Sequence, residues 1–167
     1  MSNDDNPEKW LQDLDRKRRS IDLRLDREGR WWHDGQPFDH PRLIGAFNRG
    51  LALHEESREP ILRVGTQWCY IHCEDTPFIA LRAQFEPARL VVTMNTEERV
   101  QIPTNGLTYL GEYLYALLED GRLVRFNRAA TASLAGHLTQ HADRFVLTGP
   151  DGTCWPIDSP STGPQPA

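Results

Sequence analysis

The sequence predicts an α+β protein made of two diverged β-β-α-β-β units that are joined by a central antiparallel meander. Three observations support this fold class. Apolar residues alternate with polar ones through most of the chain, which is typical of half-buried strands. Turns rich in glycine separate the strands. Two short segments instead carry apolar residues at helical spacing, each after a strand–turn–strand pattern.

These patterns divide the chain into five segments. A polar helix over residues 7–19 is expected within the first of them, and three prolines without apolar periodicity predict disorder in the last. The segments are the N-terminal helix (1–20), the first repeat unit (21–76), the central meander (77–106), the second repeat unit (107–157) and the tail (158–167).

The duplication is predicted from the order and spacing of matching features. In each unit a Gly-Arg turn joins two strands, and two apolar helix residues follow at similar distances. A strand that contains tryptophan then closes the unit. The matching positions are Gly29 and Gly121 in the turns, Leu43 and Leu134, then Phe47 and Leu138, in the helices, and Trp68 and Trp155 in the closing strands.

Local signals predict where the elements begin and end. Asp39 is expected to cap the helix of the first unit, and Asn127 the helix of the second. The second helix is expected to continue to Leu138. A single strand over 68–73 is expected near the end of the first unit.

Composition bounds the classes of function. The net charge of −5 and pI of about 5.7 do not suit a protein that binds nucleic acid through a basic stripe. The one dense basic run, Arg16 to Arg19, is interpreted as a solvated helix end. No apolar run approaches the ~20 residues of a membrane span, and the N-terminus lacks the pattern of a secretory signal. With three cysteines, the expected location is the cytoplasm, without membrane or nucleic-acid partners. The oligomeric state does not follow from the sequence.

Four short segments follow one another along the chain: Asp26-Arg27-Glu28-Gly29-Arg30-Trp31-Trp32-His33-Asp34-Gly35-Gln36-Pro37, Glu74-Asp75-Thr76-Pro77-Phe78, Met94-Asn95-Thr96-Glu97-Glu98-Arg99-Val100, and Leu118-Glu119-Asp120-Gly121-Arg122-Leu123 with Asn127-Arg128. In this order they resemble motifs of domain-of-unknown-function family 1285 (DUF1285), a bacterial family. The resemblance covers about residues 20–157 and implies a duplicated core whose C-terminal half is similar to a pleckstrin-homology-like domain. It also implies a nucleotide-like ligand at the interface between the halves and a role in signalling. The chain departs from the family at 67–72, where a more charged strand is expected.

Clusters of cysteine and histidine predict no metal site. On one strand, Cys69 and Cys73 share a face while His72 points to the other, so the three cannot converge on a metal ion. His137 and His141 have the i, i+4 spacing of helical ligands, but no third ligand is obvious, so we interpret them as surface histidines. We therefore expect no metal and no cofactor.

Catalytic signatures are also absent from the sequence. There is no Gly-x-Ser-x-Gly motif and no phosphate-binding glycine loop. The adjacent acids at 74–75 and at 97–98 would serve acid–base chemistry only if the fold brought them together. A hydrolase that uses these paired carboxylates is therefore the least favoured of the functions considered.

Arginine and tryptophan residues form the candidate binding set. Arginine binds phosphate or carboxylate in two-point fashion, and tryptophan stacks on flat rings. A non-enzymatic ligand-sensing or signalling protein is therefore the leading hypothesis, with a small anionic, nucleotide-like molecule bound between the two halves. The alternative is a protein–protein interaction module without a small ligand, in which exposed sheet edges accept partner strands. The predicted ligand-binding residues are Trp31, His33, Arg42, Asn95, Arg99, Arg122, Arg125 and Arg128.

Overall fold

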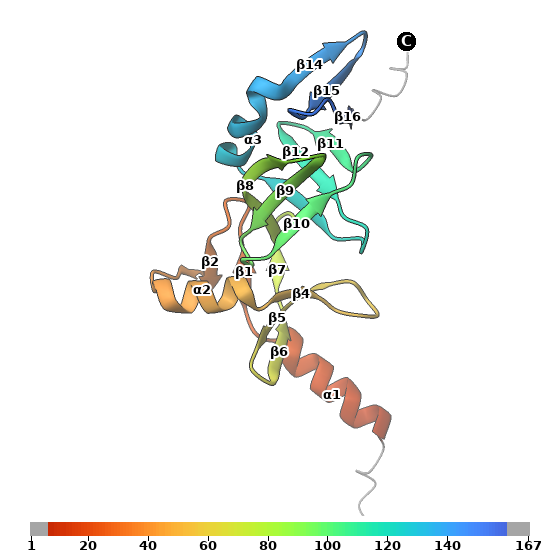
Figure 1. Cartoon of the computed structure of the whole chain (residues 1–167). Coiled ribbons are helices and arrows are strands. Elements are labelled where there is room, and N and C mark those ends of the chain that lie inside the picture. Colours follow the sequence, from red (N-terminus) through yellow and green to blue (C-terminus); the bar gives the residue numbers. More distant parts are fainter. Residues whose placement is uncertain (1–6, 160–167) are drawn as a thin grey trace, which may run out of the picture. The chain divides into compact units, whose positions relative to one another are not determined.

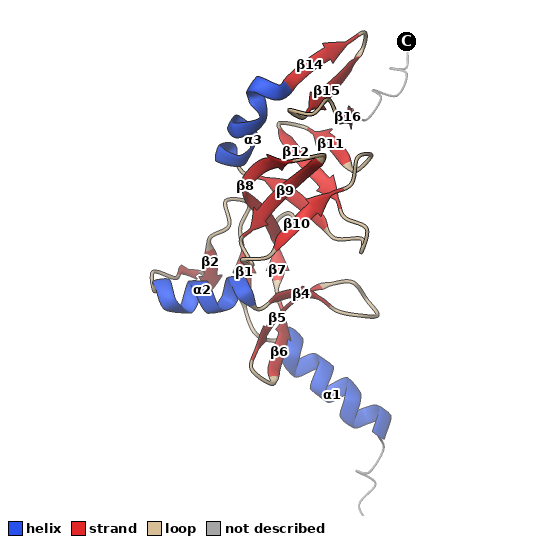
Figure 2. Cartoon of the chain, viewed as in Figure 1, coloured by secondary structure: helices blue, strands red, loops and turns tan. Residues whose placement is uncertain are grey.

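The chain forms two compact units, the first ending at Pro77 and the second beginning at Phe78. The computed structural model, drawn in Figure 1, describes residues 7–159. It is α+β, with three α-helices and a larger share of strand, as Figure 2 shows. The part of the predicted tail from residue 160 onward lies outside the described residues, and Asp158 belongs to the last strand. No helix within the described range is long and apolar enough to cross a bilayer.

The first unit contains two helices and two small sheets. One sheet has the strand order β3-β2-β1-β7, and the other has the order β4-β5-β6. The polar helix predicted over 7–19 is confirmed as α1. The elements are α1 (Pro7–Arg19), β1 (Leu23–Leu25), β2 (Trp31–His33), β3 (Gln36–Pro37), α2 (Pro41–Arg49), β4 (Leu51–Leu53), β5 (Pro60–Val64), β6 (Gln67–Tyr70) and β7 (His72–Cys73).

Asp26 organises the β1–β2 hairpin and explains why its motif is rich in polar residues. Its Oδ1 accepts the backbone N–H groups of Glu28 and Arg30 at 3.0 and 2.8 Å. Its Oδ2 accepts the Arg30 Nε–H and the Trp32 Nε1–H, both at 2.9 Å. Burial acts to raise the pKa of Asp26, but these hydrogen bonds outweigh it and lower the pKa overall. The Asp26 carboxylate therefore stabilises the turn by accepting four hydrogen bonds.

Two local predictions for the first unit are wrong. His40, not Asp39, is the N-cap of α2, and its ring Nδ1 accepts the backbone N–H of Leu43 at 3.3 Å. The single strand expected over 68–73 is split between the two sheets. The N–H of Ile71 donates to the Pro60 carbonyl, after which the chain leaves β5 and pairs in parallel with β1.

The second unit is built on one nine-stranded sheet with the order β10-β9-β8-β13-β12-β11-β16-β15-β14. The predicted meander is confirmed as β8, β9 and β10, and it forms part of this sheet. The Trp155 indole N–H of β16 donates to the Ile102 carbonyl of β10 at 3.3 Å, so the sheet curves around its core. The elements are β8 (Phe78–Glu86), β9 (Arg89–Met94), β10 (Arg99–Ile102), β11 (Leu107–Leu110), β12 (Tyr113–Leu117), β13 (Leu123–Phe126), α3 (Arg128–Leu134), η1 (Ala135–His137), β14 (Leu138–His141), β15 (Arg144–Thr148) and β16 (Cys154–Asp158).

The helix of the second unit is shorter than predicted. Asn127 caps α3 as expected, because its side chain accepts the Ala130 N–H at 2.8 Å. The helix does not continue to Leu138, which begins β14 and pairs with Leu147 of β15. Backbone pairing between strands therefore replaces the last helical turn, and His137 and His141 do not share a helix face.

Both units contain a hairpin, a helix and a three-stranded antiparallel meander in the same order. The glycine turn, which is one of the features that predicted the duplication, is weaker evidence for it than this order of elements, because the same turn also occurs elsewhere in the chain. In each of four hairpins the first turn residue donates to the carbonyl of the fifth, and the fourth donates to the carbonyl of the first. Two of the four lie outside the matched positions, so the duplication stays a prediction. The turns begin at Asp26, Met94, Leu118 and Gly149.

Candidate functional site

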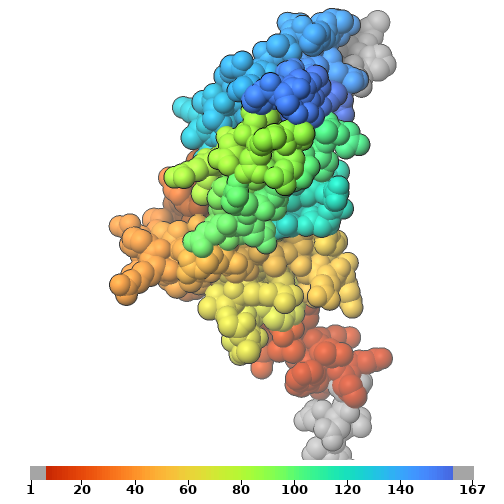
Figure 3. Space-filling model, in the orientation of Figure 1, coloured from red at the N-terminus to blue at the C-terminus, as the bar shows by residue number. Residues whose placement is uncertain are grey.

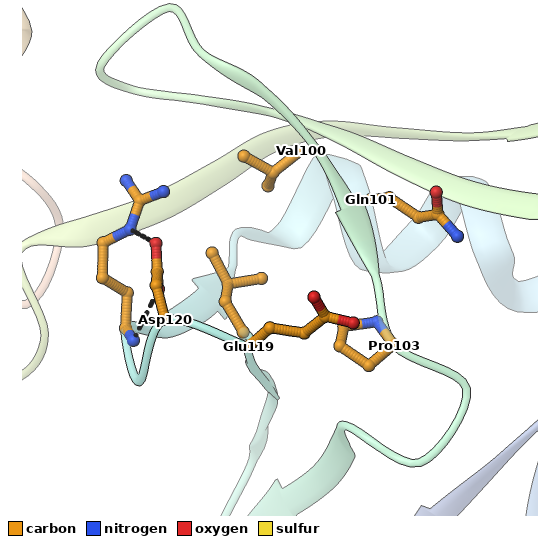
Figure 4. A pocket seen from close by; sticks show the side chains of 7 residues that line it. Val100, Gln101, Pro103, Glu119 and Asp120 are labelled. Atoms are coloured by element: carbon orange, nitrogen blue, oxygen red, sulfur yellow. Dashed lines mark hydrogen bonds and ion pairs between the residues drawn. The ribbon is translucent and has the colours of Figure 1, made fainter.

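An open groove of about 420 Å³ lies in the second unit beside the edge strand β10. We call it the β10 groove. One wall comes from β10 and the residue after it, and the other from the turn between β12 and β13 (Figure 4). In Figure 4 the Glu119 side chain reaches from the turn toward Pro103. The lining residues are Val100, Gln101, Pro103, Leu118, Glu119, Asp120 and Arg122.

The β10 strand carries a free backbone edge. The N–H of Met94 donates to the Glu98 carbonyl at 2.9 Å, so these two residues form a hydrogen-bonded pair. In an antiparallel ladder such pairs alternate, which makes Val100 and Ile102 the residues that bond to β9. Arg99 and Gln101 therefore direct their backbone N–H and C=O groups away from β9.

The charge of the β10 groove is set by one arginine and several carboxylates. Arg122 is about one-fifth exposed; its Nε donates to Asp120 at 2.8 Å and its Nη1 to Glu98 at 2.6 Å. Burial acts to lower the pKa of Arg122, but the bonds to Glu98 and Asp120 raise it overall. Glu119 adds a further exposed carboxylate to the lining. Two carboxylates, Glu119 and Asp120, and one guanidinium line the groove, so its lining carries excess negative charge.

The predicted binding residues of the first unit differ in exposure. Trp31 is 1% exposed, donates its indole N–H to Asn48 Oδ1 at 2.8 Å and meets the edge of Phe47. It is a core residue, and its neighbour Trp32 is only half-buried. His33 and Arg42 are exposed, and the ring of His33 lies 3.5 Å from the Asp34 carboxylate.

The predicted residues of the second unit mostly have partners within that unit. Asn95 is buried and holds the Ile79 N–H with its Oδ1 at 3.0 Å. Arg99 is paired with Glu86. Arg125 is 5% exposed and lies over the Tyr113 ring, whereas Arg128 is exposed at the start of α3.

The structure brings Arg122 into a groove, but it gives Asn95 and Trp31 structural contacts. A ligand site that combines residues of both units stays a prediction. Sequence reasoning assigned Glu119 and Asp120 only to a turn and missed their place in the groove. Their position next to an edge strand depends on the curvature of the sheet, for which the sequence carries no signal. In residues 7–159 no three His, Cys, Asp or Glu side chains could hold a metal ion together.

Comparison with known proteins identifies the fold. No family model and no curated protein matches the sequence. A DUF1285 family protein from Silicibacter pomeroyi DSS-3 is similar in structure, with a TM-score of 0.61 and 20% identity over 81% of this chain and 79% of that chain. Another DUF1285 family protein, from Shewanella baltica OS155, gives a TM-score of 0.54 and 16% identity over 70% and 92%. The chain has a DUF1285-like fold, which confirms the resemblance noted in the sequence, and the name of that family marks a domain of unknown function.

Proposed function

We propose that the protein is a non-enzymatic interaction module that binds an extended segment of another protein along β10. The free backbone edge of β10, lying beside an acidic groove, carries this proposal. A segment that adds to a sheet edge gains main-chain hydrogen bonds, and neighbouring pockets read alternate side chains. The outward N–H and C=O groups of Arg99 and Gln101 supply those bonds.

The chemistry of the β10 groove specifies the partner. Excess carboxylate beside the edge strand favours a lysine or arginine side chain on the incoming segment. Glu119 is the best placed acceptor, because it is exposed and lines the groove. Asp120 and Glu98 are already shared with Arg122. The expected partner is therefore an extended segment with a basic residue opposite the β12–β13 turn.

A peptide-display selection on the immobilised full chain tests this function. The selected peptides are expected to be extended and basic. Gln101→Pro removes an outward N–H without breaking the ladder to β9, a substitution that edge strands tolerate, and should weaken binding about tenfold or more. Glu119→Lys should do the same through charge. Glu112→Lys, an exposed acid outside the groove lining, is the matched control.

The outcomes of this experiment separate clearly. Circular dichroism and thermal melting first establish that each variant is folded. If the folded Gln101→Pro and Glu119→Lys variants bind the selected peptides as tightly as the unaltered protein does, β10 is not the site. A selection that yields no peptide also counts against the proposal.

One observation favours the small anionic ligand that the sequence predicts, because Arg122 lines the β10 groove. An anion there must compete with Glu98 and Asp120 for the guanidinium, which makes this the weaker candidate. Native mass spectrometry of gently purified protein tests it, and a retained nucleotide-sized adduct would support ligand sensing. Alanine at Arg122 should then weaken binding at least about tenfold.

A further inference from the structure

Helix α1 is held to the first unit by its last turn. None of its residues is buried, and Trp10 and Leu11 are 63% and 56% exposed. Figure 3 shows the red segment of α1 extending beyond the yellow strands of the same unit. An isolated helix of 13 residues is marginal in water, so the contacts of its last turn decide whether α1 stays docked.

Arg19 binds in a site that matches the shape of a guanidinium group. Its Nη1 and Nη2 donate to the two carboxylate oxygens of Glu59, each at 2.9 Å. The guanidinium also lies over the Tyr70 ring, 3.8 Å from the ring centroid. Its Nε donates to Asp15 of α1 itself at 2.8 Å. A two-point carboxylate and an aromatic face are together the arrangement that distinguishes arginine from lysine.

Arg18 binds a second aromatic ring beside the first. Its guanidinium lies 3.7 Å from the centroid of the Trp68 ring. Residues two apart on a strand share a face, so Trp68 and Tyr70 of β6 form one surface, and their rings lie 5.3 Å apart. The ring of His54 completes the cluster at 5.3 and 5.7 Å from them. We call this set, with Glu59, the guanidinium surface.

We propose that the guanidinium surface is a binding site for two adjacent arginines, and that an Arg-Arg segment of a partner protein binds there by displacing α1. The contacts with Glu59 and with the Trp68 and Tyr70 rings described above are made by arginine head groups, while Trp10 and Leu11 of α1 stay exposed. A different segment with the same two residues can therefore replace α1 with little loss of apolar burial, because no residue of α1 is fully buried. The guanidinium surface lies in the first unit and the β10 groove in the second, so the two sites can be tested separately.

The test uses the full chain with Arg18→Ala and Arg19→Ala combined, which empties the surface. The matched control is Arg16→Ala with Lys17→Ala, which removes the same charge from the same helix without touching the aromatic rings. The probe is a blocked peptide with the sequence of residues 7–22. Calorimetry should show the peptide binding the emptied variant about tenfold more tightly than it binds the unaltered protein or the control.

Specificity for arginine gives a second arm. A peptide with Arg18→Lys and Arg19→Lys should bind the emptied variant about tenfold more weakly, because lysine lacks the planar fork. Equal affinity for all three proteins, or no binding to the folded, emptied variant, overturns the proposal.

Hydrogen exchange keeps the inference testable if the double variant folds poorly. Glu59→Gln changes a single, partly exposed side chain and should raise the exchange rate of the α1 amides about tenfold. Exchange of α1 that is identical in the unaltered protein and in Glu59→Gln would mean that Arg19 does not latch the helix, which also overturns the proposal.

Discussion

The indole N–H of Trp32 donates to Oδ2 of Asp26 at 2.9 Å, and this bond ties the second strand of the first hairpin to its turn. Asp26 accepts three further hydrogen bonds from backbone and guanidinium donors. A buried carboxylate with so many donors leaves all of them unsatisfied when it is removed. The polar opening motif thus has a structural role in this fold.

Asp26→Ala should therefore destabilise the first unit by about 2–4 kcal/mol. The change in the free energy of unfolding is measured by urea denaturation, with tryptophan fluorescence as the signal. Asp39→Ala is the matched control, because Asp39 is exposed and is not the cap of α2. Equal stability of the two variants would contradict the role given to Asp26.

Acid should release α1 through Glu59. The pKa of Glu59 is lowered to about 2 from an ordinary 4.5. The largest cause is its hydrogen bonding with Arg19, and the next is a hydrogen bond with Ser57. A carboxyl with a lowered folded pKa stabilises the docked state above pH ~4.5, and this contribution is lost as the pH falls toward 2. The circular dichroism signal of helix at 222 nm should therefore decrease in the unaltered protein as the pH falls from about 4.5 to 2, until it equals the signal of Glu59→Gln. Signals that differ by a constant amount from pH 7 to pH 2 would contradict it.

Glu97 occupies a turn position that favours glycine. It has φ of 71°, and the same position in the other three turns is held by glycine. Glu97→Gly and Glu97→Ala remove the same side-chain contacts, but only alanine keeps the strained Cβ. The glycine variant should be more stable than the alanine variant by about 1 kcal/mol. Thermal melting of the two variants side by side checks this, and an alanine variant of equal stability would show that the turn relaxes.

Gly50 is a position where any side chain meets backbone. A Cβ there would lie 2.0 Å from the Arg63 carbonyl oxygen, whereas a Cβ on Gly136 would meet nothing within 4 Å. Gly50→Ala should cost at least ~2 kcal/mol, and Gly136→Ala should be neutral or stabilising by up to ~1 kcal/mol. Denaturant midpoints of both variants give the comparison. A neutral Gly50→Ala would mean that β4 and β5 do not approach as closely as described.

Sequence periodicity predicted many of the elements, because strand alternation and capping are local. The polar helix, the β8–β9–β10 meander and the Asn127 cap are all read from neighbouring residues. Predictions from local sequence patterns failed where hydrogen bonding to another strand replaced the locally preferred structure. Leu138 fits a helix stripe but gains a ladder with Leu147, and the segment over 68–73 changes sheets at Ile71.

The candidate sites could be predicted less well than the elements. Arg18 and Arg19 looked like a solvated helix end, because their partners lie about 40–50 residues away in sequence. Trp31 and Asn95 looked available for a ligand, but burial gives each a hydrogen-bond partner within the protein. By itself the sequence determined the α+β class, most of the turns and the DUF1285-like fold. Only the tertiary structure decided which arginines meet carboxylates or aromatic rings, because such pairs are made by chain segments that are distant in sequence.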